Sequence, residues 1–223
     1  MTPEELEKLP KPLERTMTAL ELAIMAEIIS RIKAAAQITP VVDWLMTRLD
    51  AVKAGRARMK RIIGEAIAKS GLDVDAIYEQ AARSNHTRMK EIYEQSGRDY
   101  TPYEEDPWMQ QTVEAVREQT KGSLREMENI TQTTGFRIPS GGGKDFVPLS
   151  QYLEQSLDKA MLAIATGMKT YNQAIGDVID EMTASGVRVV DYASGKSDRI
   201  EVAARRAVMT GVAQLTDKVN EKN

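Results

Sequence analysis

The strongest structural constraint in this sequence is an apolar stripe that starts just after two prolines near the N-terminus. Large apolar residues recur at steps of three and four positions, the spacing of one α-helical face: Leu13, Met17, Leu20, Ile24, Ile28 and Ile32. Aromatic residues make up only 5% of the 223 residues, whereas methionine occurs 12 times, so a core must come from aliphatic and Met side chains packed between helices. The pattern predicts an all-α fold, an elongated multi-helix protein with a Gly-rich internal loop and at most one short strand.

Further helices are predicted from apolar spacing and from start and stop signals. Thr39-Pro40 and Asp106-Pro107 each combine an N-cap residue with a proline suited to a first helical turn. Gly55 and Ser70-Gly71 are interpreted as helix ends. The predicted helices cover residues 13–37, 41–55, 62–71, 73–95, 108 to past 122, 149–166, 171–183 and 198 to near the C-terminus.

Two segments lack helical periodicity. The β-branched run Val187–Tyr192 is the only strand candidate, and it has no obvious partner strand. Residues 131–148 contain Gly141-Gly142-Gly143, which has the widest backbone freedom in the chain. We therefore predict an N-terminal helical region at 1–133, a Gly-rich linker at 134–148 and a C-terminal helical region at 149–223.

Charge and cysteine content narrow the function classes. The formal net charge is −3, so no global positive field draws the chain to DNA, and any contact with nucleic acid must be local. The absence of cysteine excludes disulfides and thiolate metal sites, and a cytosolic origin is expected. No apolar run is long enough to span a bilayer, so no membrane partner is expected.

No motif predicts catalysis. We therefore expect no catalytic residue, no cofactor-binding residue and no metal ligand. His86 is the single histidine and is interpreted as an ordinary polar helix position. The glycines before Lys144 do not form a phosphate-binding loop, because Ile138 stands where the motif needs glycine and Asp145 follows the lysine. The acidic run Glu104-Glu105-Asp106 is interpreted as a solvated loop.

Basic residues gather in two places. For the first, Arg56, Arg58, Lys60 and Arg61, a solvated helix face is the favoured interpretation, and phosphate contact is the alternative. The second is our candidate for contact with a partner or with DNA, and salt bridges to Asp191, Asp198 or Glu201 are its structural alternative. It comprises Arg188, Lys196, Arg199, Arg205 and Arg206.

Three segments carry a resemblance to a known family. The opening Met1–Glu14, the central Glu118–Gly122 and the late Asp191–Val212 resemble the phage minor capsid proteins of prophages in Gram-positive bacteria, of the minor capsid protein 2 type. The last segment also resembles, more distantly, the Mu F-like head-morphogenesis proteins. Members of the family usually extend further, so we expect the native chain to continue past Asn223.

The resemblance implies a minor structural protein of a tailed-phage head, made in the bacterial cytoplasm and located inside the head at the portal vertex. It is expected to support head morphogenesis, to be oligomeric in the virion and to have no enzymatic activity. The implied partners are the portal protein, the major capsid protein or both, with packaged DNA as a further one. Two alternatives stay open: a DNA-contacting packaging or ejection accessory, and a carrier of a C-terminal enzymatic domain.

The predicted linker leads to a proteolysis experiment. We expect limited trypsin digestion to cut first at Arg137 or Lys144, because exposed glycine-rich segments are the most accessible to proteases, and to leave two folded fragments. Mass spectrometry of the earliest fragments measures this. First cuts between Arg56 and Arg61 would instead contradict the division into two regions.

Overall fold

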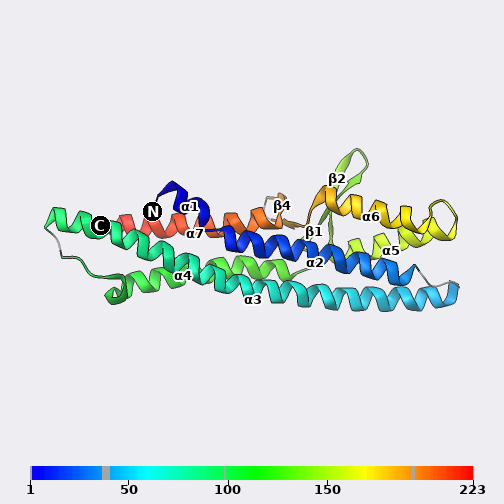
Figure 1. Ribbon diagram of the computed structural model, residues 1–223, viewed down its shortest axis with the longest axis horizontal. Coiled ribbons are helices and arrows are strands. Elements are labelled where there is room, and N and C mark those ends of the chain that lie inside the picture. Colours follow the sequence, from blue (N-terminus) through cyan, green and yellow to red (C-terminus); the bar gives the residue numbers. More distant parts are fainter. Residues whose placement is uncertain (1, 37–40, 98, 192–193, 223) are drawn as a thin grey trace. The chain divides into compact units, whose positions relative to one another are not determined.

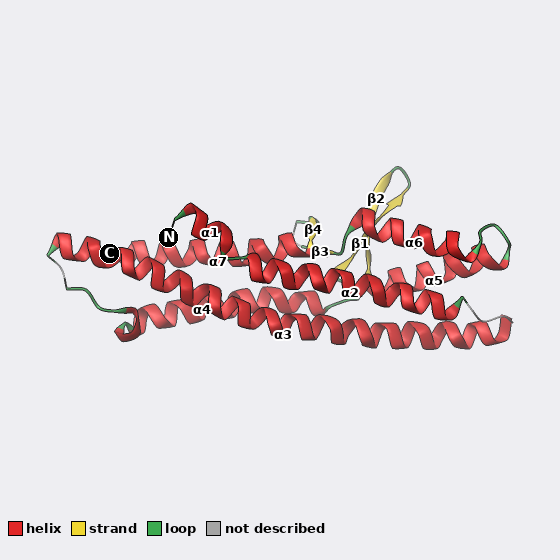
Figure 2. Ribbon diagram, viewed as in Figure 1, coloured by secondary structure: helices red, strands yellow, loops and turns green. Residues whose placement is uncertain are grey.

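The computed structural model describes residues 2–36, 41–97, 99–191 and 194–222. Helices dominate, with a small sheet inserted late in the chain (Figures 1 and 2). The helices are α1 (Pro3–Lys8), α2 (Lys11–Ala35), α3 (Val41–Ser96), α4 (Pro107–Arg125), α5 (Leu149–Ala165), α6 (Tyr171–Ser185) and α7 (Ile200–Lys222), with 3-10 turns η1 (Tyr103–Glu105) and η2 (Glu126–Glu128). The strands are β1 (Thr134–Ser140), β2 (Gly143–Pro148), β3 (Arg188–Val190) and β4 (Ser197–Arg199).

The N-terminal apolar stripe forms one buried face of α2, as predicted. All six of its residues, from Leu13 to Ile32, are buried. The predicted start of the next helix at Thr39-Pro40 lies outside the described residues.

The three helices predicted between residues 41 and 95 are one helix, α3, so the predicted breaks at Gly55 and Ser70-Gly71 are wrong. Buried positions continue through both breaks at steps of three and four: Val52, Gly55, Met59, Ile63, Ile67, Ser70, Val74, Ile77 and Ala81. A glycine inside a helix costs about 1 kcal/mol relative to alanine. Burial of each large aliphatic side chain stabilises by about 1.5–3 kcal/mol, which outweighs that cost.

The prediction of an all-α fold with at most one short strand is wrong, because four strands form an antiparallel sheet in the order β2-β1-β3-β4. The Gly-rich segment is not a structureless loop but the β1–β2 hairpin, with Ser140 opposite Gly143. Gly141 and Gly142 have φ angles of +49° and +97°, and such tight hairpin turns favour glycine. The predicted strand at Val187–Tyr192 contains β3, and its partners are β1 and β4.

The chain divides into two compact units. Unit 1 comprises Met1–Thr16, Ile67–Arg125 and Glu201–Asn223, and unit 2 comprises Met17–Ala66 and Glu126–Ile200. The division predicted from the sequence, at residues 134–148, stays a prediction that the proteolysis experiment tests.

Unit 1 is a helical assembly centred on Tyr78 of α3. The buried Tyr78 hydroxyl lies 2.7 Å from Thr120 Oγ1 of α4 and donates to the Val208 carbonyl of α7 over 3.2 Å. Burial raises the pKa of Tyr78 above its ordinary value, so this phenol stays a neutral hydrogen-bonding group. Tyr78 thus joins three helices.

Unit 2 combines the sheet with helices. The buried rings of Phe136 in β1 and Tyr152 in α5 have centroids 4.5 Å apart, so the sheet packs on α5. Two ion pairs, Arg48–Asp158 and Arg56–Glu154, join α3 to α5. Between them, a Cβ added at Gly55 would lie 2.6 Å from Leu153 Cδ2, so the glycine that looked like a helix end permits close helix packing.

A similar close approach at Gly211 of α7 generates a stability prediction. A Cβ there would lie 1.8 Å from the Tyr78 hydroxyl oxygen and 3.0 Å from Thr120 Oγ1. We expect Gly211→Ala to lower the free energy of unfolding by about 1–3 kcal/mol through overpacking. In a Tyr78→Phe background the additional loss should be smaller by about 1 kcal/mol, because the clashing oxygen is gone.

Urea denaturation followed by circular dichroism measures all four members of this cycle. Gly122→Ala in α4 is the matched control, because nothing lies within 4 Å of an added Cβ at that helical position. It should stabilise the protein by up to about 1 kcal/mol. An equal cost of Gly211→Ala in both backgrounds would contradict the proposed clash.

Candidate functional site

Three of the five predicted contact residues lie on the β3–β4 pair of unit 2. Arg188 and Arg199 are directly opposite each other in the strand register. The half-buried Arg188 donates to the carbonyls of Ser185 and Ser197, both over 3.1 Å. The exposed Lys196 lies 3.6 Å from an oxygen of Asp198, which is one of the pairings considered from the sequence.

Arg199 lies beside a buried carboxylate of α2, that of Glu21. Glu21 accepts the Val187 backbone N–H over 3.1 Å, and the same oxygen lies 3.9 Å from Arg199 Nη2. Gly186, with φ +66°, leaves room for this guanidinium, since a Cβ there would lie 2.5 Å from Arg199 Nε. The arrangement connects the start of β3 and the end of β4 to α2.

The other two predicted contact residues lie on α7 in unit 1. Arg205 donates to a carboxylate oxygen of Glu14 over 2.9 Å, and Arg206 has an exposed side chain. The five residues therefore fall in two units. Sequence reasoning missed Glu14 and Glu21 as partners because they are more than 170 positions away along the chain.

The first basic cluster lies on one part of α3 in unit 2. Arg56 pairs with Glu154, and Arg61 lies 3.7 Å from Glu65 in an ion pair whose two side chains are both mostly exposed. Exposed pairs of this kind contribute little stability.

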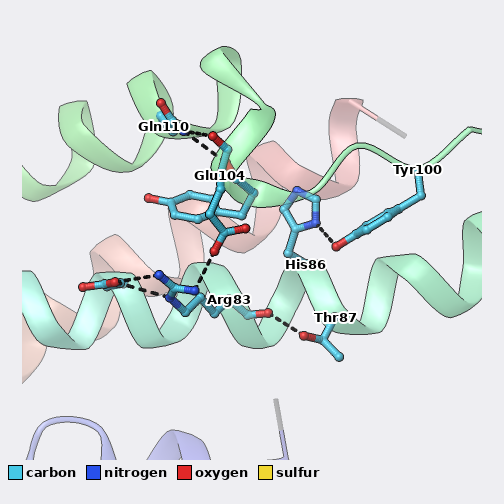
Figure 3. A network of polar contacts seen from close by, with 8 residues as sticks. Arg83, His86, Thr87, Tyr100, Glu104 and Gln110 are labelled. Atoms are coloured by element: carbon cyan, nitrogen blue, oxygen red, sulfur yellow. Dashed lines mark hydrogen bonds and ion pairs between the residues drawn. The ribbon is translucent and has the colours of Figure 1, made fainter.

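The single histidine belongs to a polar network that joins α3 to the segment before α4 (Figure 3). His86 Nδ1 lies 2.6 Å from the Tyr100 hydroxyl, and the two rings make an edge contact with centroids 5.0 Å apart. Arg83 pairs with Glu79 and Glu104, and Gln110 donates to the Tyr103 and Glu104 carbonyls. His86, interpreted from the sequence as an ordinary polar helix position, is thus buried, and its contacts hold the segment that contains η1.

A pocket of about 150 Å³ lies beside this network in unit 1. Its lining includes His86, Met89, Tyr93, Tyr100 and Trp108. Burial, with a smaller effect of Glu104, raises the pKa of Tyr100, so this phenol stays protonated at neutral pH. Within the described residues, no group of three His, Cys, Asp or Glu side chains gathers to hold a metal ion.

An apolar groove of about 240 Å³ lies between α5 and α6 in unit 2. Leu162 and Met168 line it and are 61% and 68% exposed, so both present apolar surface to solvent at the groove. Two ion pairs, Lys159–Glu181 and Lys169–Asp177, join α5 and its following loop to α6 and also line the groove. An apolar centre with a charged border is the usual composition of a protein-binding site.

The comparisons with known proteins now identify the chain. Residues 1–223, the whole sequence, match the family described as phage minor capsid protein 2. The chain belongs to this family. No curated protein and no solved structure matches the chain significantly.

Membership in the phage minor capsid protein 2 family gives the chain a structural role in a phage particle, in association with other virion components. None of the described helices is both long and apolar enough to cross a membrane.

The His86 network of this minor capsid family member leads to a prediction about local order. We expect His86→Ala to cost about 1–3 kcal/mol, the sum of one hydrogen bond with Tyr100 and edge contacts with the rings of Tyr100 and Tyr103. Hydrogen–deuterium exchange should then rise selectively in residues 99–106. Thr87→Ala is the control, because among the described residues the exposed Thr87 hydroxyl bonds only to the Arg83 carbonyl of its own helix. Unchanged exchange in His86→Ala would contradict this role.

Proposed function

We propose that this family member is a minor structural protein of the phage head that docks on the portal protein or the inner wall of the major capsid shell. In this position it supports head morphogenesis, in several copies per virion, and performs no catalysis. Family membership supports the structural role, and the α5–α6 groove is the observation that supports docking through helix faces.

The groove has room for a few aliphatic side chains that project from a partner protein, for example from one face of a helix. Burying Leu162 and Met168 against such a helix removes two large apolar side chains from water, worth about 1.5–3 kcal/mol each. Methionine is flexible and adapts to irregular partner surfaces. The lysines and carboxylates beside the groove already pair with one another, so the apolar side chains supply the affinity for a partner.

Direct DNA contact through Arg188, Lys196, Arg199, Arg205 and Arg206 is the second candidate function, that of a packaging or ejection accessory. The observed contacts weigh against it. The Arg188 guanidinium already donates to two carbonyls, Arg199 has Glu21 beside it, and Arg205 binds Glu14. A phosphate at these sites would have to compete with intramolecular acceptors.

The docking proposal is tested in assembled particles. In phage carrying the Leu162→Glu, Met168→Glu variant, we expect the amount of this protein in purified heads to fall at least tenfold, because two carboxylates in an apolar interface remain without partners. Quantitative mass spectrometry of purified heads measures the amount, and chemical cross-linking measures contact with the portal and major capsid proteins.

Leu72→Glu is the matched control, because Leu72 of α3 is 71% exposed and lies in unit 1. It should leave incorporation unchanged, and thermal melting of both purified variants verifies that they fold. Parental heads in which this protein never cross-links to portal or capsid protein would disprove docking. Normal incorporation of the groove variant would disprove the role of the groove.

A further inference from the structure

The part of α3 that follows its first turns carries a strongly basic sequence. From Ala51 to Gly64 there are five lysines and arginines and no acidic residue. The whole segment lies in one helix and in unit 2, so its side chains occupy known positions around a single helical axis. The whole chain has a net charge of −3, so this segment is much more positive than the rest of the chain.

Three of these cations, Lys53, Lys60 and Arg61, have exposed side chains, and we call them the α3 basic stripe. Lys53 and Lys60 are seven positions apart, about two helical turns, so they lie along the same side of α3, and Arg61 lies about 100° further around the helix. The buried residues Val52, Gly55, Met59 and Ile63 occupy the remaining part of the helix surface. The stripe is therefore directed away from the core of its unit.

The stripe is also less neutralised than the second basic cluster. In the part of the chain that the structure describes, no carboxylate lies within ion-pair distance of Lys53 or Lys60, and Arg61 has only the exposed pair with Glu65. By contrast, Arg188, Arg199 and Arg205 of the second cluster each contact carbonyl or carboxylate groups. Lys53, Lys60 and Arg61 thus have fewer acceptors within the chain than Arg188, Arg199 and Arg205 do, although the sequence alone favoured a plain solvated face for the first cluster.

We propose that the α3 basic stripe binds the phosphate backbone of double-stranded DNA without regard to base sequence. The inference rests on the proposed position inside the phage head, where packaged DNA is the abundant polyanion. About 12 Å of helix separates Lys53 from Arg61, and duplex DNA presents about seven phosphate charges over that length. Three flexible cationic side chains therefore reach phosphates without any deformation of the duplex.

The stripe itself favours DNA over a protein partner. Large hydrophobic side chains are exposed on α3 before it, at Leu45, Met46 and Leu49, and after it at Leu72, but none of the described residues between Asp50 and Gly71 exposes one. Protein interfaces depend on a buried apolar or aromatic centre, which the stripe does not supply. Ala54 and Ala57 are exposed beside the cations and are too small to obstruct a flat approach. Exposed aromatic residues, which stack on the bases of single strands, are also missing from this stretch.

Fluorescence anisotropy with the full chain and a labelled 30-base-pair duplex tests this proposal. Three phosphate contacts give a slope of about −2.7 in log affinity against log salt concentration, so affinity should fall about 40-fold between 50 and 200 mM salt. The Lys53→Gln, Lys60→Gln, Arg61→Gln variant should bind at least tenfold more weakly at 50 mM salt and lose most of the salt dependence. Glutamine is a good helix former, so α3 should be retained, and circular dichroism verifies this.

Two further variants compare the α3 basic stripe with basic residues elsewhere in the chain. Lys8→Gln, Lys90→Gln, Lys218→Gln removes the same charge from exposed positions in unit 1 and should leave DNA affinity within about twofold. Arg199→Gln, Arg205→Gln, Arg206→Gln tests the second cluster. The proposal is overturned if the parental chain does not bind DNA, if the stripe variant binds like the parent, or if either comparison variant loses as much affinity.

Incorporation into heads distinguishes this inference from the docking proposal. The stripe variant should still be incorporated and still cross-link to its protein partners, since its α5–α6 groove is unchanged. Loss of DNA binding with normal incorporation supports the stripe. Normal incorporation of the groove variant, by contrast, would disprove docking through the groove and leave the DNA result intact.

Discussion

Buried residues on α3 follow one another at steps of three and four from Met59 to Ala81, and both units draw core residues from this one face. A continuous helix is the only way to keep that spacing over so many turns. Its glycines are tolerated for that reason, and Gly55 even contributes by allowing Leu153 to approach the backbone. The positions of Tyr78 in unit 1 and of the Arg48 and Arg56 ion pairs in unit 2 follow from the same helical register.

Elements governed by local chemistry could be predicted from the sequence. Asp106 caps α4 through the Met109 N–H over 3.2 Å, and α5 and α6 begin at the expected residues. The sheet could not be predicted, because β3 and β4 are only three residues long and β1 is more than 45 positions from β3. Three consecutive glycines fit a flexible linker and a tight hairpin turn equally well, and only the pairing of the flanking strands distinguishes the two.

The candidate sites show the same limit. The second basic cluster is visible in the sequence, but Glu14 and Glu21, which pair with Arg205 and Arg199, come from a helix at the other end of the sequence. His86 was expected to be an ordinary polar position, and its buried contact with Tyr100 depends on how the segment after α3 folds back. The groove between α5 and α6 had no sequence signal, because Leu162 is indistinguishable from a core leucine until the packing is known.

The two surfaces proposed for unit 2, the α5–α6 groove and the α3 basic stripe, differ in the physical origin of their affinity. Burial of Leu162 and Met168 in the groove is driven by the hydrophobic effect and is insensitive to moderate salt. Contacts of the α3 basic stripe with phosphate are driven by counterion release and weaken steeply as salt rises. On these two proposals, salt concentrations that release DNA from the stripe leave the groove contact in place, so the two contacts are separable by ionic strength.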